Sequence, residues 1–359
     1  MKSVIGNNII FSLFGESHSE LMGITIHNLP SGLKIDEERI ARELQRRRPD
    51  GKLSNARFED DKYQIISGLF NSFTTGAPLT IIVNNQNCNS QNYTFGLVRP
   101  SHADYPAYVR SRGYNDYRGG GSYSGRLTVL LVIAGTICKE ILETQNIKIG
   151  SHIKSIGNIC DEINEENFDK IFSSQKMVSS ESFEKVKELV KETMKKKDSL
   201  GGVIEAFVSG LPVGVGEPFF DSLESVLSHY IFSIPGVKGV TFGSALEMAK
   251  GYGSNFSDEL KYENDKIIFR SNHNGGINGG LSNGNLLTCC AYFKPTPTTG
   301  LPLKTININT KENITYEFAG RHDTCYALRC DVILESVLAM GILDLYLSMN
   351  VWNKLWKED

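Results

Sequence analysis

Several short segments of the chain alternate apolar and polar residues, or are rich in β-branched residues, as β-strands are. These segments are residues 3–14, 23–28, 63–67, 78–84, 203–208, 236–242, 266–270 and 286–293. Glycine, proline or asparagine follows most of them within a few residues, and these residue types favour turns. The pattern predicts many short strands joined by turns.

Other segments have the hydrophobic period of a helix. One helix is expected to begin after Asp36, which is a good N-cap, and to end before Pro49. Residues 127–143 are apolar on nearly every face, which predicts a buried helix. Residues 180–197 predict an amphipathic helix, and residues 332–347 predict a strongly apolar one.

One pattern occurs twice. A strand, the turn L-P-x-G and a capped helix follow one another in residues 23–48, and again from residue 203 onward. In the second copy Asp221 and Glu224 form an Asp-x-x-Glu capping box, which predicts a helix from Asp221. We expect a duplicated β-α unit within one fold; chance is the alternative, since the side chains otherwise differ. No stretch has the composition of a linker, so residues 1–359 are expected to form a single domain.

Composition narrows the class of protein. The chain has 359 residues, of which 40% are hydrophobic and 22% charged, as in soluble globular proteins. Its net charge of −3 argues against a general nucleic-acid binder. The N-terminus lacks the features of a signal peptide, and the apolar segment 127–138 is too short to span a bilayer. Seven cysteines without a C-x-x-C pair fit free thiols in a reducing compartment, so we expect a cytoplasmic protein with no membrane partner.

Residues 99–126 concentrate groups that bind anions. Besides His102 and the three glycines 119–121, this stretch contains only two carboxylates, Asp104 and Asp116, against five arginines. The arginines are Arg99, Arg110, Arg112, Arg118 and Arg126. Glycine amides and guanidinium groups hold phosphate or carboxylate, and histidine transfers protons near neutral pH. The glycines precede the predicted buried helix, whose N-terminus favours an anion; a solvated basic loop is the alternative.

Four further segments are candidates for a site. Arg46–Arg48 ends the first helix, where cations also stabilise the helix dipole, so anion binding and capping are both open. Residues 271–284 are too rich in glycine and asparagine for regular structure, and we expect a functional loop. Residues 294–298 supply a cation and hydroxyls on a stiffened loop. Arg321 and Asp323 either form an ion pair at the surface or line a pocket.

Nine motifs stand in one order along the chain. They are FGESH (14–18), RRRP (46–49), TTGAPL (74–79), RPSHADY (99–105), YNDYRGGG (114–121), SIPGVKGV (233–240), SNHNGGINGGLSNG (271–284), KPTPT (294–298) and GRHDTC (320–325). With these motifs the chain resembles chorismate synthases nearly end to end, except over residues 158–198. The resemblance implies an α+β fold, a single-domain β-α-β sandwich with helices packed between antiparallel sheets, and a homotetramer.

The resemblance also implies a carbon-oxygen lyase of aromatic amino acid biosynthesis. Its reaction is the anti-1,4 elimination of phosphate from 5-enolpyruvylshikimate 3-phosphate to give chorismate, the last step of the shikimate pathway. It uses reduced FMN (FMNH2) without net redox change. NADPH is a candidate reductant, but the chain lacks the dinucleotide fingerprint, so an external flavin reductase is expected as a partner. The substrate is a small anionic molecule, and neither a metal site nor nucleic acid is expected.

Residue roles follow from the motif match. His102 is expected near the leaving phosphate, His18 near the flavin, and Asp323 beside the flavin nitrogen that accepts the substrate proton. The residues expected to bind FMN are Ser122, Tyr123, Ser124, Gly279, Lys294, Pro295, Thr296, Pro297, Thr298 and Arg321. The residues expected to bind the phosphate of substrate or NADP are Arg47, Arg48, Lys52 and Arg126.

The chain departs from the family pattern at three places. Ser122 and Leu127 stand where the family commonly has arginine and glutamate, Lys52 replaces a second arginine, and Thr324 replaces proline. One flavin contact is therefore expected to be missing. A non-catalytic relative that binds flavin is an alternative, as is an RNA-binding module built on the arginine triplet, although the acidic net charge disfavours the latter.

Overall fold

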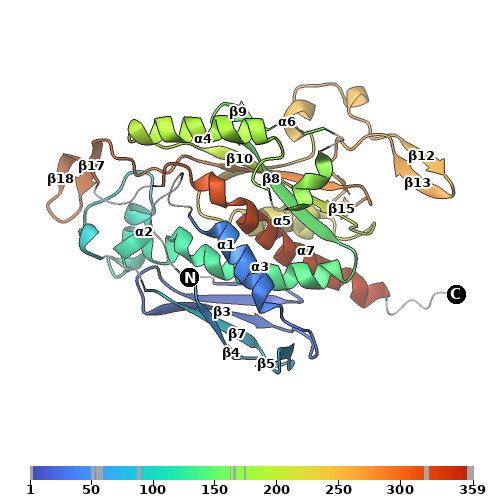
Figure 1. The fold of residues 1–359 in the computed structure, drawn as a ribbon, viewed down its shortest axis with the longest axis horizontal. Coiled ribbons are helices and arrows are strands. Elements are labelled where there is room, and N and C mark those ends of the chain that lie inside the picture. Colours follow the sequence, from blue (N-terminus) through green and yellow to red (C-terminus); the bar gives the residue numbers. More distant parts are fainter. Residues whose placement is uncertain are drawn as a thin grey trace.

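The computed structural model describes residues 3–49, 53, 60–86, 90–161, 163–164, 167–173, 175–318 and 323–353. Two five-stranded sheets enclose a layer of helices, and one further helix covers the outer face of the upper sheet (Figure 1). This arrangement confirms the expected α+β sandwich with helices between antiparallel sheets.

The first half of the chain builds the lower sheet in Figure 1. Its strands are β1 (Val4–Ile5), β2 (Ile10–Gly15), β3 (Leu21–His27), β4 (Tyr63–Ser67) and β7 (Leu79–Asn84), and its helices are α1 (Glu37–Arg47) and α3 (Thr128–Glu143). The strand order is β1-β2-β3-β7-β4, and each neighbouring pair is antiparallel. The strand predicted over 3–14 is divided because Gly6, with a φ of 102°, turns the chain between β1 and β2.

The second half follows the same path. Its strands are β8 (Lys148–Ile156), β9 (Ile159–Cys160), β10 (Gly202–Ser209), β11 (Val237–Phe242) and β16 (Leu287–Phe293), and its helices are α5 (Leu223–Ile231) and α7 (Asp331–Asn353). The order is β11-β16-β10-β8-β9, again antiparallel. Four strands of each half correspond in their order across the sheet: β2-β3-β7-β4 in the first half and β8-β10-β16-β11 in the second. Along the sequence, a helix (α1 or α5) lies between the first two of these strands and the last two. The duplicated unit therefore extends over four strands and two helices in each half.

The remaining elements lie around these halves. They are β5 (Leu69–Phe70), β6 (Phe73–Thr74), β12 (Leu260–Glu263), β13 (Lys266–Phe269), β14 (Ile277–Asn278), β15 (Leu281–Ser282), β17 (Leu303–Asn307), β18 (Glu312–Tyr316), α2 (Asp104–Ser111), α4 (Ser180–Lys195) and α6 (Ala245–Met248). Seven short 3-10 helices complete the described part: η1 (Ser90–Asn92), η2 (Arg118–Tyr123), η3 (Gly125–Leu127), η4 (Phe168–Ser173), η5 (Phe219–Asp221), η6 (Gly253–Asn255) and η7 (Tyr326–Arg329).

Two predictions about local structure are wrong. The cap of α5 is Ser222, whose hydroxyl accepts a hydrogen bond from the Ser225 amide at 3.1 Å, whereas Asp221 closes η5. Residues 271–284 are not irregular throughout, because they contain the small hairpin β14–β15. Glycines at positive φ, such as Gly279 at 62°, let the chain turn between these two strands.

The helices α3 and α7 cross at the centre of the core. A Cβ at Gly135 of α3 would lie 2.3 Å from Cβ of Ser336 on α7, so the two backbones approach closely. Residues Asp331–Met349 are long and apolar enough to cross a membrane, but 78% of this stretch is buried inside the protein. We therefore interpret α7 as a core helix, which packs between α3 and the strands β8 and β10 of the upper sheet.

A buried ionic network joins α1, α3, α7 and β8. It is called the helix network below, and its members are Arg46, Lys139, Lys176, Glu43, Asp331 and Glu335. Glu335 accepts hydrogen bonds from both terminal nitrogens of Arg46, at 2.8 and 2.7 Å, and from Ser151 at 2.7 Å. Burial alone would raise the pKa of Glu335, but Arg46 and Lys139 lower it well below the usual range.

The stretch without motif matches, around α4, is fastened to the upper sheet by a buried histidine. His152 of β8 is bonded through Nδ1 to Asp161 at 2.7 Å and through Nε2 to Glu205 at 3.2 Å. Asp161 also accepts hydrogen bonds from the amides of Val178 and Ser179, at the start of α4. Burial would lower the pKa of His152, but the two carboxylates raise it overall.

Candidate active site

His18 lies at the end of β2 and packs against the glycine loop. Its Nδ1 is hydrogen-bonded to Ser90 at 3.0 Å, and its ring meets Tyr93 edge to face at 5.3 Å between centroids. A Cβ at Gly119 would come within 2.5 Å of the His18 ring. The sequence places these residues a hundred positions apart, and the fold brings them into contact.

The three glycines 119–121 form a tight left-handed path. Their φ angles are 60°, 86° and 53°, which L side chains rarely adopt. Ser124 then caps η3 by accepting a hydrogen bond from the Arg126 amide at 3.3 Å, and α3 begins at Thr128. The prediction that the glycine loop precedes a buried helix is confirmed.

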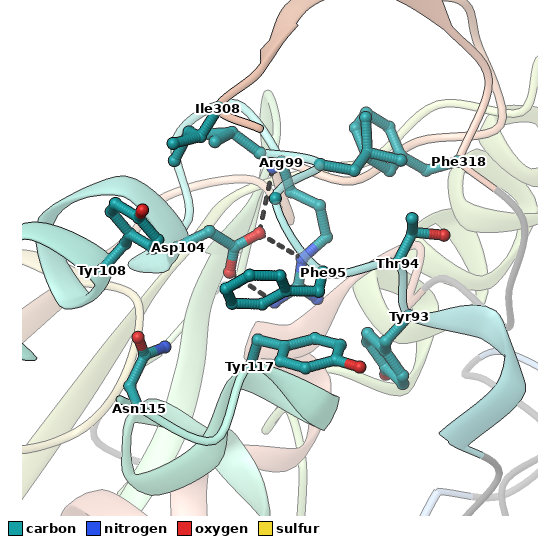
Figure 2. A pocket seen from close by; sticks show the side chains of 13 residues that line it. Tyr93, Thr94, Phe95, Arg99, Asp104, Tyr108, Asn115, Tyr117, Ile308 and Phe318 are labelled. Atoms are coloured by element: carbon teal, nitrogen blue, oxygen red, sulfur yellow. Dashed lines mark hydrogen bonds and ion pairs between the residues drawn. The ribbon is translucent and has the colours of Figure 1, made fainter. Parts of the chain in front are cut away.

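Two arginines of this stretch are paired with carboxylates nearby in sequence. Arg99 makes two hydrogen bonds of 2.8 and 2.7 Å to Asp104, and Arg118 makes two of 2.8 Å to Asp116. The first pair lines a cavity of about 40 Å³, together with aromatic residues such as Phe95 and Tyr117 (Figure 2). This cavity is too small for a triply anionic metabolite. Asp104 and Asp116 therefore offset part of the positive charge of this stretch, because each carboxylate pairs with one guanidinium.

His102 meets the loop 294–298. Its Nε2 is hydrogen-bonded to the hydroxyl of Thr298, and Lys294 donates from Nζ to the carbonyl oxygen of Ser101 at 2.7 Å. Burial and the neighbouring Lys238 lower the pKa of Lys294. His102, which is expected near the leaving phosphate, and the loop 294–298, which is expected to bind FMN, are therefore in direct contact.

Arg47 and Arg126 are joined through one carboxylate, Asp61. Arg47 Nη2 donates to Asp61 Oδ2 at 2.7 Å, while Arg126 Nη1 donates to Oδ1. Arg126 also reaches Asn85 Oδ1 at 3.4 Å, and Arg48 Nε lies 3.7 Å from Asp61 Oδ2. The Asp61 side chain is fully buried. Sequence reasoning missed Asp61, because it lies outside the motifs and shows no periodic signal.

Asp323 is paired with Arg329. Arg329 donates to Asp323 Oδ2 from Nε at 3.0 Å and from Nη2 at 2.7 Å, and lies 4.9 Å above the Tyr326 ring. Within the described part of the chain, the second oxygen of Asp323 is buried without a hydrogen-bond partner. Asp323 is therefore oriented through one oxygen, and Arg329 is a second residue that the motif reading did not single out.

Among the residues that the structure describes, these form one buried group with an excess of positive charge. It is called the arginine centre below, and its members are Arg47, Arg126, Arg329, Asp61 and Asp323. Burial, together with repulsion from Arg329 and Arg126, lowers the pKa of Arg47. Burial would raise the pKa of Asp61, but the two arginines lower it. Within the described part of the chain, three guanidinium groups against two carboxylates make this centre suited to an anionic ligand.

The sequence matches the chorismate synthase family over residues 9–347. The chain belongs to the chorismate synthase family. The chorismate synthase of Thermococcus kodakarensis is 37% identical over 351 residues, which cover 97% of this chain and 98% of the relative. That of Dehalococcoides mccartyi (strain BAV1) is 36% identical over 364 residues and covers both chains fully. A crystal structure of chorismate synthase has a TM-score of 0.74 and 25% identity, covering 96% of this chain and 93% of that one.

Membership of the chorismate synthase family makes the chain a carbon-oxygen lyase. Of the remaining candidate residues, Ser122 lies 3.4 Å from Glu16 Oε1, and Tyr123 is 41% exposed. Gly279 lies in the turn between β14 and β15, whose neighbours bond to residues 214–223 rather than to the loop 294–298. Lys52 and Arg321 lie outside the described residues.

Proposed function

We propose that this enzyme converts 5-enolpyruvylshikimate 3-phosphate into chorismate and phosphate by anti-1,4 elimination, as the last step of the shikimate pathway. The observation that carries the proposal is the arginine centre. Its guanidinium groups are buried, the Nε of Arg47 has no partner among the described residues, and the substrate brings a phosphate and two carboxylates. Arg47, Arg48 and Arg126, with Lys52, would bind the phosphate of the substrate or of NADP.

The residues around His102 fit reduced FMN. The Thr296 hydroxyl, in the same loop as Thr298, is buried without a partner among the described residues. Gly279 lies apart in the turn between β14 and β15, where a Cβ would meet no atom within 4 Å. Lys294–Thr298, Gly279, Ser122–Ser124 and Arg321 would hold the cofactor. When bound, reduced FMN supplies an electron-rich ring with a nitrogen that accepts the proton leaving the substrate.

Three side chains would move or hold protons. Thr298 orients the His102 ring, which would donate a proton to the departing phosphate oxygen. Ser90 orients His18, whose proton would tune the charge beside the flavin. Arg329 holds one oxygen of Asp323, so that the other would face the flavin nitrogen.

We further propose a cytoplasmic homotetramer in which each chain is one domain. One hydrophobic core containing residues of both halves, such as Ile81 and Ile204, supports the single domain. The six described cysteines carry free thiols, which fits a reducing compartment. NADPH is the proposed source of electrons, delivered through an external flavin reductase.

An anaerobic assay with photoreduced FMN tests this function. Chorismate should form with catalytic amounts of reduced flavin, and activity should disappear in air. Turnover with oxidised FMN, or one flavin oxidised per product, would contradict the proposal. Flavin binding without any turnover would indicate the non-catalytic relative instead.

The role of His102 has its own outcome in the same assay. His102→Ala should lower kcat by ~10²–10⁴-fold, the usual contribution of general acid–base catalysis, with FMN affinity little changed. A variant that loses flavin but keeps its turnover at saturating FMN would show that His102 serves the cofactor.

A further inference from the structure

The end of α1 and the start of α3 present two arginines to the same carboxylate. One oxygen of Asp61 accepts from Arg47 and the other from Arg126, so the distance between the guanidinium groups is fixed by the width of one carboxylate. Such a spacing also suits a carboxylate or phosphate that is bound by the same two groups from the other side.

The hydrogen bonds to Asp61 leave donors of Arg47 for a ligand. Arg47 uses Nη2 for Asp61 and reaches Thr128 from Nη1 at 3.5 Å, whereas its buried Nε has no partner among the described residues. Buried donors without partners are rare in native proteins and point to a bound molecule. The Arg47 guanidinium is therefore held by Asp61 without being saturated by it.

The backbone of Asp61 is adapted to this position. Its φ of 46° lies in the left-handed region, which aspartate and asparagine tolerate better than most residues do. Its neighbour Asp60 pairs with Lys62 at 2.9 Å and lies 3.6 Å from Nη2 of Arg48, with 42% of its side chain exposed. Of these two adjacent carboxylates, one is enclosed between Arg47 and Arg126, and the other is partly exposed beside Arg48 and Lys62.

We propose that Asp61 is a positioning residue, which holds Arg47 and Arg126 at the separation required to bind an anionic group of the ligand. The inference rests on the proposed function for the identity of that ligand. Asp61 does not contact the reacting atoms; it acts through the two arginines. Without it the guanidinium groups repel each other and separate.

The charge on Asp61 allows two opposite expectations. If Asp61 only neutralised the arginines, Asp61→Asn would raise the local positive charge and tighten anion binding. If it positions them, the same substitution weakens binding. Asparagine keeps the shape and tolerates the left-handed backbone, so the sign of the change separates the two roles.

The experiment compares three variants of the full-length enzyme loaded with reduced FMN. Asp61→Asn should raise KM and Kd for the substrate about 10- to 100-fold, with kcat within about threefold of the wild type. Asp60→Asn, the matched control, should leave both constants within about twofold. Glu335→Gln breaks the helix network and should lower the melting temperature without raising KM, which controls for general loss of stability.

Titrations at a temperature where all variants are folded identify the anion. Parallel weakening for inorganic phosphate and substrate assigns the pair to a phosphate, weakening for substrate alone assigns it to a carboxylate, and weakening for NADPH alone assigns it to the dinucleotide. Unchanged or tighter binding of all three to Asp61→Asn would overturn the proposal. If the wild type formed no chorismate, the proposed function would be wrong. The phosphate titration would still test whether Asp61 positions the two arginines for an anion.

Discussion

Arg46 and Arg47 are neighbours on α1, yet they enter two buried charge clusters of different composition. Arg46 belongs to the helix network, in which three cations face three carboxylates. Arg47 belongs to the arginine centre, in which three cations face two carboxylates among the described residues. Successive residues of a helix point about 100° apart, so one side chain enters the helix layer and the next enters the site.

The difference separates a structural role from a ligand-binding one. A balanced buried network is complete in itself, and removing any member leaves an unpaired charge. An unbalanced one is completed by a ligand of opposite charge. Two arginines of the triplet 46–48 are thus separated: Arg46 is part of the helix network, and Arg47 belongs to the arginine centre, for which we propose anion binding.

The largest effect is expected in the balanced cluster. Glu335→Gln leaves Arg46 and Lys139 short of a buried counter-charge, and should cost about 3–5 kcal/mol of unfolding free energy. Urea denaturation measures this loss. KM at a permissive temperature should stay at the wild-type value; a raised KM would mean that the two clusters are not independent.

The next effect concerns the unbalanced cluster. Arg47→Ala removes a charge-assisted contact of ~1.5–3 kcal/mol, so KM for the substrate should rise by roughly one to two powers of ten, more than kcat falls. The loss of stability should be smaller than for Glu335→Gln, because Asp61 keeps Arg126. Unchanged kinetics with a lower melting temperature would assign Arg47 to the structure alone.

Much of this arrangement could be predicted from the sequence, and the reason is local. The period of apolar residues predicted α1, α3, α4 and α7, and the glycines predicted the loop before α3. Asp61 could not be predicted, because its partners approach it only when β4, α1 and η3 have assembled. The contact between His102 and Thr298 likewise depends on where β16 ends, and no neighbouring residue signals it.

Acid should destabilise both clusters through their carboxylates. The pKa values of Glu335 and Asp61 are lowered in the folded protein, so the stability they contribute is present above about pH 4 and is lost as the pH falls through the folded values. Between pH 4 and pH 2 the wild type should lose up to about 1.4 kcal/mol more per pH unit than Glu335→Gln. Equal acid slopes in urea titrations would argue that Glu335 is not charged in the fold.

The smallest effect is expected where the chain departs from its family. The family resemblance leads us to expect an arginine where Ser122 stands. The Ser122 hydroxyl lies 3.4 Å from Glu16 Oε1, so an arginine introduced there would pair with Glu16 as Arg118 pairs with Asp116. Ser122→Arg should therefore leave FMN affinity within about twofold. Tyr123 is 41% exposed and available to pack on the flavin ring, so Tyr123→Ala should weaken binding about two- to tenfold. Anaerobic FMN titrations of both variants decide between the two residues. Tighter binding by the arginine variant, with no effect of removing Tyr123, would mean that the wild type lacks a positive charge that binds FMN and that Glu16 does not neutralise the introduced arginine.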